Sequence, residues 1–169
     1  MVRMGEAEVA FEAWYRALHP RLLASLTLIT GNGETARDAT DEACTRAFQH
    51  WKRVSRMDSP DAWTFTVARN VARRGARRTK QERSLMKLQG AGAISTVPAP
   101  AGEAWALVAG LPERQRTAVV LRHVADLTEP QIARVMRTTR GTVSTTLADA
   151  HRALRAKLNE DEMKEAPRG

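Results

Sequence analysis

The sequence predicts an all-α protein built from two small helical domains. Apolar residues recur mostly three and four positions apart, the spacing of one helix face. No stretch alternates apolar and polar residues for more than a few positions, so strands are not expected. A segment at 90–102 is rich in Gly, Pro and Ala and uncharged, and it separates the two helical halves. We expect domains at 1–80 and 104–158, a flexible linker at 81–103 and an acidic tail at 159–169.

The first half carries three predicted helices. The first spans about 9–29 with a bend at its internal proline, and a Gly-Asn-Gly turn ends it. The second spans about 34–53. Ser59 caps the third, which has Pro60 as its first residue and continues to about 80. The predicted core positions are Phe11, Trp14, Tyr15, Leu18, Leu22, Leu26, Ala39, Ala43, Ala47, Trp51, Trp63, Phe65, Val67, Ala68, Val71 and Ala72.

The third helix has a basic face. Between 66 and 80 it holds six basic residues and no acidic one, although like charges four positions apart disfavour a helix. Five polar side chains fall within about 140° of its circumference. These are Arg69, Asn70, Arg73, Arg74 and Arg77. The guanidinium groups can bind phosphates while the amide reaches bases, which favours nucleic-acid binding. The alternative is a solvated basic face.

The second half predicts a helix-turn-helix. Helices at about 105–111 and 113–124 come first, and a capping box at 128–131 then opens a short helix. A turn at 137–140 leads into a longer helix from Gly141, which begins with small polar residues. Its buried stripe is Val143, Leu147, Ala150, Leu154 and Leu158. Its outward residues are Thr142, Ser144, Thr145, Asp149, Arg152 and Arg155, which can meet phosphates or base edges. An ordinary amphipathic hairpin is the alternative.

The charge is spread over both halves. The 169 residues include 27 Lys and Arg against 19 Asp and Glu, a formal charge of +8. Residues 1–80 hold 14 basic and 9 acidic side chains, and residues 104–158 hold 9 and 4. This favours binding of a polyanion by both halves. One alternative is that the positive charge serves solubility alone. The other is that it reflects the base composition of the genome, since a genome rich in G and C favours Arg codons and Arg outnumbers Lys here 22 to 5.

Several function classes are disfavoured. The sequence has a single cysteine, Cys44, which excludes an internal disulfide framework and predicts a cytoplasmic protein. We expect Cys44 to be a small core residue and not a redox sensor. The longest apolar run, 105–111, is too short to span a membrane, so no membrane insertion is expected. Glu6 and Glu8 stand where a signal peptide needs an apolar segment. The four histidines lack metal-ligand spacing, and no phosphate loop or Ser-His-Asp arrangement stands out. We expect no enzyme activity, catalytic residue, metal or cofactor.

Motifs in both halves match one family in order and spacing. Those of the first half are Phe11-Glu-Ala-Trp-Tyr-Arg, His19-Pro-Arg-Leu-Leu23, Asp38 with Glu42, Arg46-Ala-Phe48, Trp51, Pro60-Asp-Ala-Trp63 and Val67-Ala-Arg-Asn70. Those of the second half are Leu111-Pro-Glu-Arg-Gln-Arg116, Val120-Leu-Arg122, Gln131-Ile-Ala133, Gly141-Thr-Val143 and 150–154. From Phe11 to about Leu158 the chain resembles the extracytoplasmic-function group of sigma-70 RNA polymerase sigma factors. The halves are then a sigma2-like and a sigma4-like domain.

The resemblance implies a promoter-specificity subunit that joins core RNA polymerase, directs it to a −35/−10 pair and opens the DNA. The residues implied for core polymerase are Asp38, Asp41, Glu42, Arg46 and Gln49. Those implied for the −10 element, with a flipped base in the loop at 55–58, are Ser55, Arg56, Met57, Asp58, Trp63, Arg69, Asn70, Arg73, Arg74, Arg77 and Arg78. Those implied for the −35 element are Thr139, Arg140, Thr142, Ser144, Thr145, Asp149 and Arg152.

The resemblance also names partners. They are core RNA polymerase, through the clamp and flap of its large subunits, double- and single-stranded promoter DNA, and an anti-sigma factor. The expected location is the bacterial cytoplasm, at the nucleoid when the protein is in holoenzyme. Some positions depart from the family: Ala39 and Cys44 replace larger apolar residues, Arg137 replaces a turn glycine, and Ser144 and Thr146 replace basic residues.

Two other functions remain open from the residues alone. One is a helix-turn-helix regulator that binds DNA without polymerase, which would need a dimerisation surface and an effector domain. The other is a protein-interaction adaptor whose helix-turn-helix no longer reads DNA, favoured by the polar and acidic residues Ser144, Thr146 and Asp149.

Overall fold

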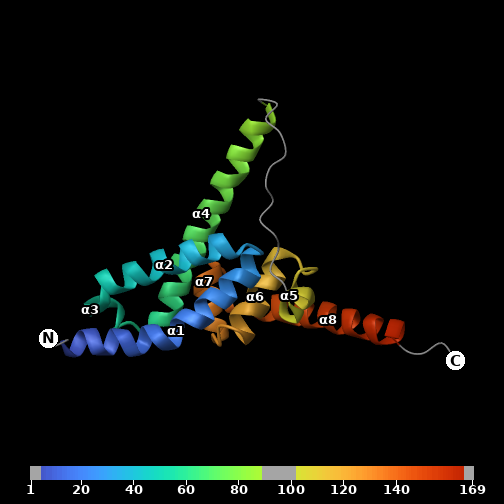
Figure 1. Ribbon diagram of the computed structural model, residues 1–169. Coiled ribbons are helices and arrows are strands. Elements are labelled where there is room, and N and C mark those ends of the chain that lie inside the picture. Colours follow the sequence, from blue (N-terminus) through green and yellow to red (C-terminus); the bar gives the residue numbers. More distant parts are fainter. Residues whose placement is uncertain (1–4, 89–101, 166–169) are drawn as a thin grey trace.

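The computed structural model describes residues 5–88 and 102–165, and over these residues the chain is helical with connecting turns and no strand (Figure 1). The all-α prediction is confirmed. The helices of the first half are α1 (Glu6–Thr30), α2 (Gly33–Gln49), α3 (Trp51–Val54) and α4 (Pro60–Leu88). Those of the second half are α5 (Glu103–Val108), α6 (Glu113–His123), α7 (Glu129–Met136) and α8 (Arg140–Glu165).

The first half is built around α2, which packs against both α1 and α4. Gly31 ends α1 in the left-handed conformation, with φ 67°, and Asn32 begins α2 by accepting a 2.9 Å hydrogen bond from the Thr35 backbone N–H. The buried face of α2 consists mainly of small residues: Ala36, Ala39, Thr40, Ala43, Cys44 and Ala47. Small side chains let neighbouring helices approach closely, and the larger Phe65 and Leu22 fill the remaining space.

Two helix ends of the first half differ from prediction. The helix predicted at 34–53 is broken at His50, which has φ −114° and ψ 19°, so that α3 is separate from α2. The helix predicted to end near 80 runs on to Leu88, because residues 81–88 contain neither Gly nor Pro. An ion pair at four-residue spacing between Arg78 and Glu82, at 3.0 Å, adds to this extension. In Figure 1 the C-terminal end of α4 stands clear of the other helices.

The second half is a helix-turn-helix, as predicted. The capping box is present, and the Thr128 backbone N–H donates to Gln131 Oε1 at 2.8 Å. The hydroxyl of Thr139 caps α8 by accepting from the Thr142 backbone N–H at 3.1 Å. Of the predicted α8 stripe, Leu158 is 48% exposed, because α8 extends beyond the turns that pack on α6 and α7.

Arg137 ends α7 with a left-handed backbone, φ 53° and ψ 54°. This conformation costs a non-glycine residue roughly 1–2 kcal/mol. We expect Arg137→Gly to raise the free energy of unfolding by about 0.5–1 kcal/mol, since glycine relieves the strain but adds unfolded-state entropy. Thermal unfolding monitored by circular dichroism measures this. The control is Arg155→Gly inside helix α8, which should instead lower stability by about 1 kcal/mol. Equal effects of the two substitutions would contradict the strain argument.

The two halves pack against each other in this structure. Helix α4 contacts α7, and α1 contacts α6 and α5. One continuous apolar cluster runs through both halves. None of the described helices has the length and apolar character needed to cross a membrane. Of the linker predicted at 81–103, residues 81–88 belong to α4, and residues 89–101 lie outside the described residues, as does the end of the predicted tail at 166–169.

Candidate nucleic-acid and protein interfaces

The basic face of α4 carries four exposed arginines in two consecutive turns. They are Arg73, Arg74, Arg77 and Arg78. Only Arg78 has an acidic partner among the salt bridges of the described residues, Glu82 on the next turn. A row of guanidinium groups on an exposed helix is suited to the phosphates of a nucleic-acid strand. The half-buried Asn70 lies one turn before this row.

Arg69 does not share this exposed face. Only 8% of the residue is accessible, and its Nη1 donates to the backbone carbonyl of Val135 in α7 at 3.5 Å. Burial lowers the pKa of this guanidinium, and the neighbouring cations Arg73, Arg114 and Arg137 add to the effect. The expectation that Arg69 is exposed is wrong here because α7 of the second half covers it. Its predicted contact with DNA stays a prediction.

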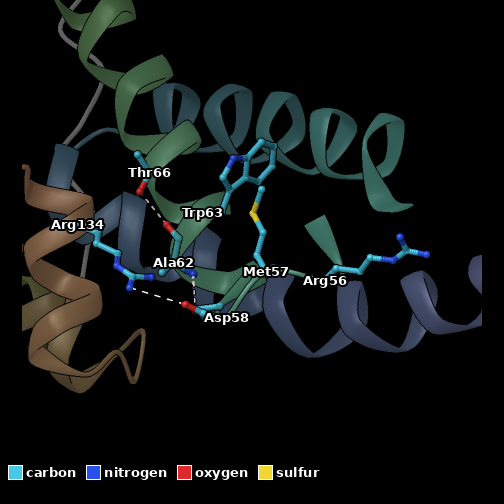
Figure 2. Close-up of a pocket in the computed structure, with 8 residues that line it drawn as sticks. Arg56, Met57, Asp58, Ala62, Trp63, Thr66 and Arg134 are labelled. Carbon is cyan, nitrogen blue, oxygen red and sulfur yellow. Dashed lines mark hydrogen bonds and ion pairs between the residues drawn. The ribbon is translucent and has the colours of Figure 1, made fainter. Parts of the chain in front are cut away.

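A hollow of about 460 Å³ lies where the loop after α3 meets the start of α4. The loop supplies Arg56, Met57, Asp58 and Ser59, α4 supplies Ala62, Trp63 and Thr66, and α7 supplies Arg134. Figure 2 shows the Met57 side chain beside the Trp63 indole, and Arg56 pointing away. The Ser59 hydroxyl fixes the entry to α4 by accepting from the Ala62 backbone N–H at 3.0 Å. This apolar wall could receive a planar group such as an unstacked base.

The start of α8 presents short hydroxyl side chains at the positive end of its helix dipole. Thr142 and Ser144 are exposed, whereas the Thr145 hydroxyl donates to the Gly141 carbonyl at 3.1 Å. Exposed Arg152 is held by Asp149 at 3.0 Å, and Arg140 by Glu129 at 3.4 Å. All seven residues predicted for the −35 element therefore lie along the first four turns of α8 and the turn before it. Only Asp149 is partly buried.

A separate acidic face lies on α2. Asp38, Asp41, Glu42 and Gln49 are exposed, and Arg46 is paired with Glu42 at 2.7 Å. The end of this face adjoins a cluster of aromatic rings from α1, α2 and α3. They are Phe11, Trp14, Tyr15, Phe48 and Trp51, with ring centroids 4.8–5.9 Å apart. Phe48 is 53% exposed, which makes this end of α2 suited to another protein.

Cys44 is buried, as predicted for a core residue. Desolvation raises the pKa of its thiol to about 11, and Asp41 adds to the effect. Within the described ranges 5–88 and 102–165, no three His, Cys, Asp or Glu side chains come together as a metal site.

Sequence reasoning missed the residues that join the halves. These are Arg21, Trp105, Arg116 and Arg134. The guanidinium of Arg21 donates to the Ala125 carbonyl at 2.9 Å and to Asp61 at 2.6 Å. No local pattern marks such residues, because the partners of Arg21 and Arg116 lie 104 and 87 positions away in sequence. The packing of Trp105 and Arg134 is set by the relative placement of the two domains.

Comparisons with known proteins cover both halves. The family model for Sigma-70 region 2 matches residues 14–82, and the model for Sigma-70, region 4 matches residues 101–154. No curated protein matches the chain significantly.

Two solved structures share the fold. One is the sigma factor RpoE in complex with the anti-sigma factor NepR from Bartonella quintana, with 19% identity, a TM-score of 0.69 and coverage of 89% of this chain and 97% of that one. The other is CnrH in complex with the cytosolic domain of CnrY, with 20% identity, a TM-score of 0.59 and coverage of 90% of each chain. The two matched regions and this two-domain helical fold lead to one family. The chain belongs to the sigma-70 family and is an alternative sigma factor that directs transcription initiation by RNA polymerase.

Proposed function

We propose that α4 and the loop before it bind the melted −10 element, that the start of α8 reads the −35 element, and that α2 docks on the clamp of core polymerase. The observation that carries this proposal is the placement of an arginine row on α4 next to the hollow at Met57 and Trp63. A single strand needs both features, since its phosphates bind cations and its unpaired bases stack on apolar or aromatic groups.

Strand opening needs a place for the unstacked base. Unstacking costs a few kcal/mol, which a preformed receptor can offset. The walls of the hollow are held by contacts of their own: Ser59 caps α4, and the Thr66 hydroxyl donates to the Ala62 carbonyl at 2.8 Å. The exposed arginines Arg73 and Arg77 continue from there along α4. The proposed path of the strand therefore runs from the loop towards the C-terminal end of α4.

The acidic face of α2 is proposed as the polymerase contact because its charge is opposite to that of the DNA-binding face. Acidic Asp38, Asp41 and Glu42 would repel a phosphate backbone and attract a basic protein surface. The proposed partners are the large subunits of the polymerase. The clamp is proposed to bind this face of α2, and the flap is proposed to bind the second domain.

We also propose regulation by an anti-sigma factor, because the chain shares its fold with the sigma factor RpoE, whose structure was solved in complex with the anti-sigma factor NepR. The protein would act in the bacterial cytoplasm and at the nucleoid in holoenzyme. The sigma-70 family is not enzymatic, and no catalytic residue, metal or cofactor is proposed for this member.

The test mixes the purified protein with bacterial core RNA polymerase and genomic DNA fragments, and sequences the transcripts that depend on its addition. Discrete start sites that share upstream elements are the expected result. Retention of DNA fragments by the protein alone, with no binding to core polymerase and no new transcripts, would indicate instead the polymerase-independent helix-turn-helix regulator.

Thr145→Ala with Arg152→Ala should change −35 preference without affecting polymerase binding. The two side chains lie on the exposed side of α8, and both have local partners that they can exchange for DNA. We expect about a fivefold loss of transcription from promoters with an intact −35 element, which corresponds to about 1 kcal/mol. The measurement is transcription from promoters with and without that element. An equal loss on both promoters would contradict base reading by this face.

A further inference from the structure

A hollow of about 190 Å³ lies between α1, α4 and α6, and it is distinct from the hollow at the loop. Apolar side chains of α1 and α4 form part of its wall. Its charged lining consists of Arg69 and Arg73 from α4 and of Arg116 and Glu113 from α6. Three guanidinium groups and one carboxylate give this arginine hollow a net charge of +2.

The protein itself satisfies few of the donors in the arginine hollow. A guanidinium group has five N–H donors. Among the described residues, Arg69 uses one of them, in a 3.5 Å hydrogen bond to the Val135 carbonyl. Arg116 uses two, at 3.3 Å to the Ile29 carbonyl and at 3.5 Å to the Ala109 carbonyl. These bonds are long and their acceptors are neutral, so most donors of the two groups have no protein acceptor.

The single acid that lines the arginine hollow does not neutralise its charge. Glu113 is exposed and takes part in none of the salt bridges found within 5–88 and 102–165. It attracts Arg69 only over a longer distance, while three further cations repel that side chain: Arg73, Arg114 and Arg137. Only 8% of Arg69 is accessible, and burial of an uncompensated guanidinium is costly. A dissolved anion would supply both the missing charge and the missing acceptors.

A phosphate group matches the arginine hollow in charge, in acceptors and in size. A phosphate monoester group carries a charge of about −1.5 to −2 at pH 7 and three strong acceptor oxygens. Guanidinium groups bind phosphate through two parallel hydrogen bonds, which makes Arg the preferred residue for such sites. The volume equals that of about six water molecules at ~30 Å³ each. It has room for a phosphate or diphosphate group, whereas the base and sugar of a nucleotide would lie outside.

We propose that the arginine hollow is a binding site for a phosphate group, which bridges α4 and α6 through Arg69, Arg73 and Arg116. The source of the group is either free phosphate or diphosphate, or the phosphate end of a nucleotide. Arg69 and Arg73 are also proposed for the DNA strand, so a bound phosphate group would compete with DNA phosphates for them. That consequence rests on the proposed function, but phosphate binding does not.

The first experiment titrates the protein with inorganic phosphate, diphosphate and ATP in a calorimeter at constant ionic strength, without DNA or polymerase. Binding of phosphate or diphosphate identifies a free anion as the ligand, and binding of ATP alone identifies a nucleotide. We expect Arg116→Gln to weaken binding about tenfold through loss of a charge-assisted hydrogen bond. Glu113→Gln should strengthen it about threefold because a repelling carboxylate is gone.

The matched controls are Arg155→Gln and Glu160→Gln, which make the same charge changes at exposed positions of α8. They separate binding in the arginine hollow from a general effect of net charge, and we expect both to bind as the parent does. Glu113→Gln also guards against misfolding as an explanation, because Glu113 is exposed and takes no part in a described salt bridge.

The second experiment observes the arginine side chains of the parent chain by nitrogen-15 NMR. We expect the Nε–H signals of Arg69, Arg73 and Arg116 to shift on addition of phosphate and to saturate at the same concentration. Each signal is assigned by its loss in the corresponding single Arg-to-Gln variant. The signal of Arg155, exposed on α8, should stay in place.

The outcomes decide the inference without reference to transcription. Saturable binding that changes with Arg116 and Glu113, but not with the α8 controls, supports it. Absence of saturable binding of all three ligands overturns it, as do equal changes in the α8 controls. A shift of every exposed arginine signal in proportion to phosphate concentration also overturns it, because that is screening by the surrounding ions. Failure of the proposed function is recognised differently, by the absence of transcripts that depend on the protein.

Discussion

Replacing Arg73 and Arg77 together by alanine is expected to lower open-complex formation by holoenzyme about 10–100-fold. Both side chains are exposed on α4 beyond the hollow, and neither has an acidic partner among the described salt bridges, so both are available for phosphates. Each charge-assisted contact to an anion contributes about 1.5–3 kcal/mol in favourable geometry, less at an exposed site. The measurement is the rate and extent of promoter opening with a fluorescent base in the −10 element.

Salt dependence gives a second readout of the same variant. Loss of two phosphate contacts to a single strand should reduce the slope of log affinity against log salt by about 1.4. The control is Arg16→Ala/Arg37→Ala, which removes the same charge from exposed positions of α1 and α2. If this control and the α4 variant open promoters equally well, α4 does not bind the strand.

Arg69 belongs in a separate experiment because of its burial. Replacing it removes the hydrogen bond to Val135 as well as the proposed DNA contact, so a change in promoter opening would have two causes. A triple variant that includes Arg69 would mix these effects, which is why the pair Arg73 and Arg77 is the cleaner test.

Local physics explains which parts of the fold were predictable. Ser59 and the box at Thr128 and Gln131 are caps whose partners lie three residues away, so sequence spacing alone specifies them. The mostly alanine face of α2 follows from helical periodicity in the same way. The sequence has Arg137 where the family has a turn glycine. In the structure Arg137 therefore takes the left-handed backbone conformation that a glycine would adopt more easily.

Tertiary placement explains what was not predictable. Arg69 lies on the same arc of α4 as Arg73 by helical periodicity, and only the position of α7 makes one buried and the other exposed. Arg134 lines the hollow of a loop more than 70 positions earlier in the chain. Periodicity describes one helix at a time, so it assigns a face but not what covers that face. The face predicted for DNA and the face covered by the second domain are in part the same.

Reversing one charge on α2, with Glu42→Lys, is expected to weaken binding to core polymerase about 30-fold. Glu42 is exposed in the middle of the acidic face and is paired with Arg46 on the next turn. A lysine there would face Arg46 and the basic partner surface proposed for the clamp. Like charges across an interface cost several kcal/mol, and a loss of about 2 kcal/mol corresponds to the stated factor. Anisotropy of a labelled chain titrated with core polymerase measures it.

Glu82→Lys is the matched control because Glu82 has the same kind of environment. Its side chain is 56% exposed against 45% for Glu42, and each forms an ion pair with an arginine four residues away. Both substitutions therefore change the net charge equally and break one local pair of small value. Since Glu82 lies on α4 and only borders the Asp38 end of the acidic face, across a shared hollow, Glu82→Lys should lower polymerase affinity much less than Glu42→Lys. A similar loss for both variants would mean that net charge, and not the face of α2, governs docking.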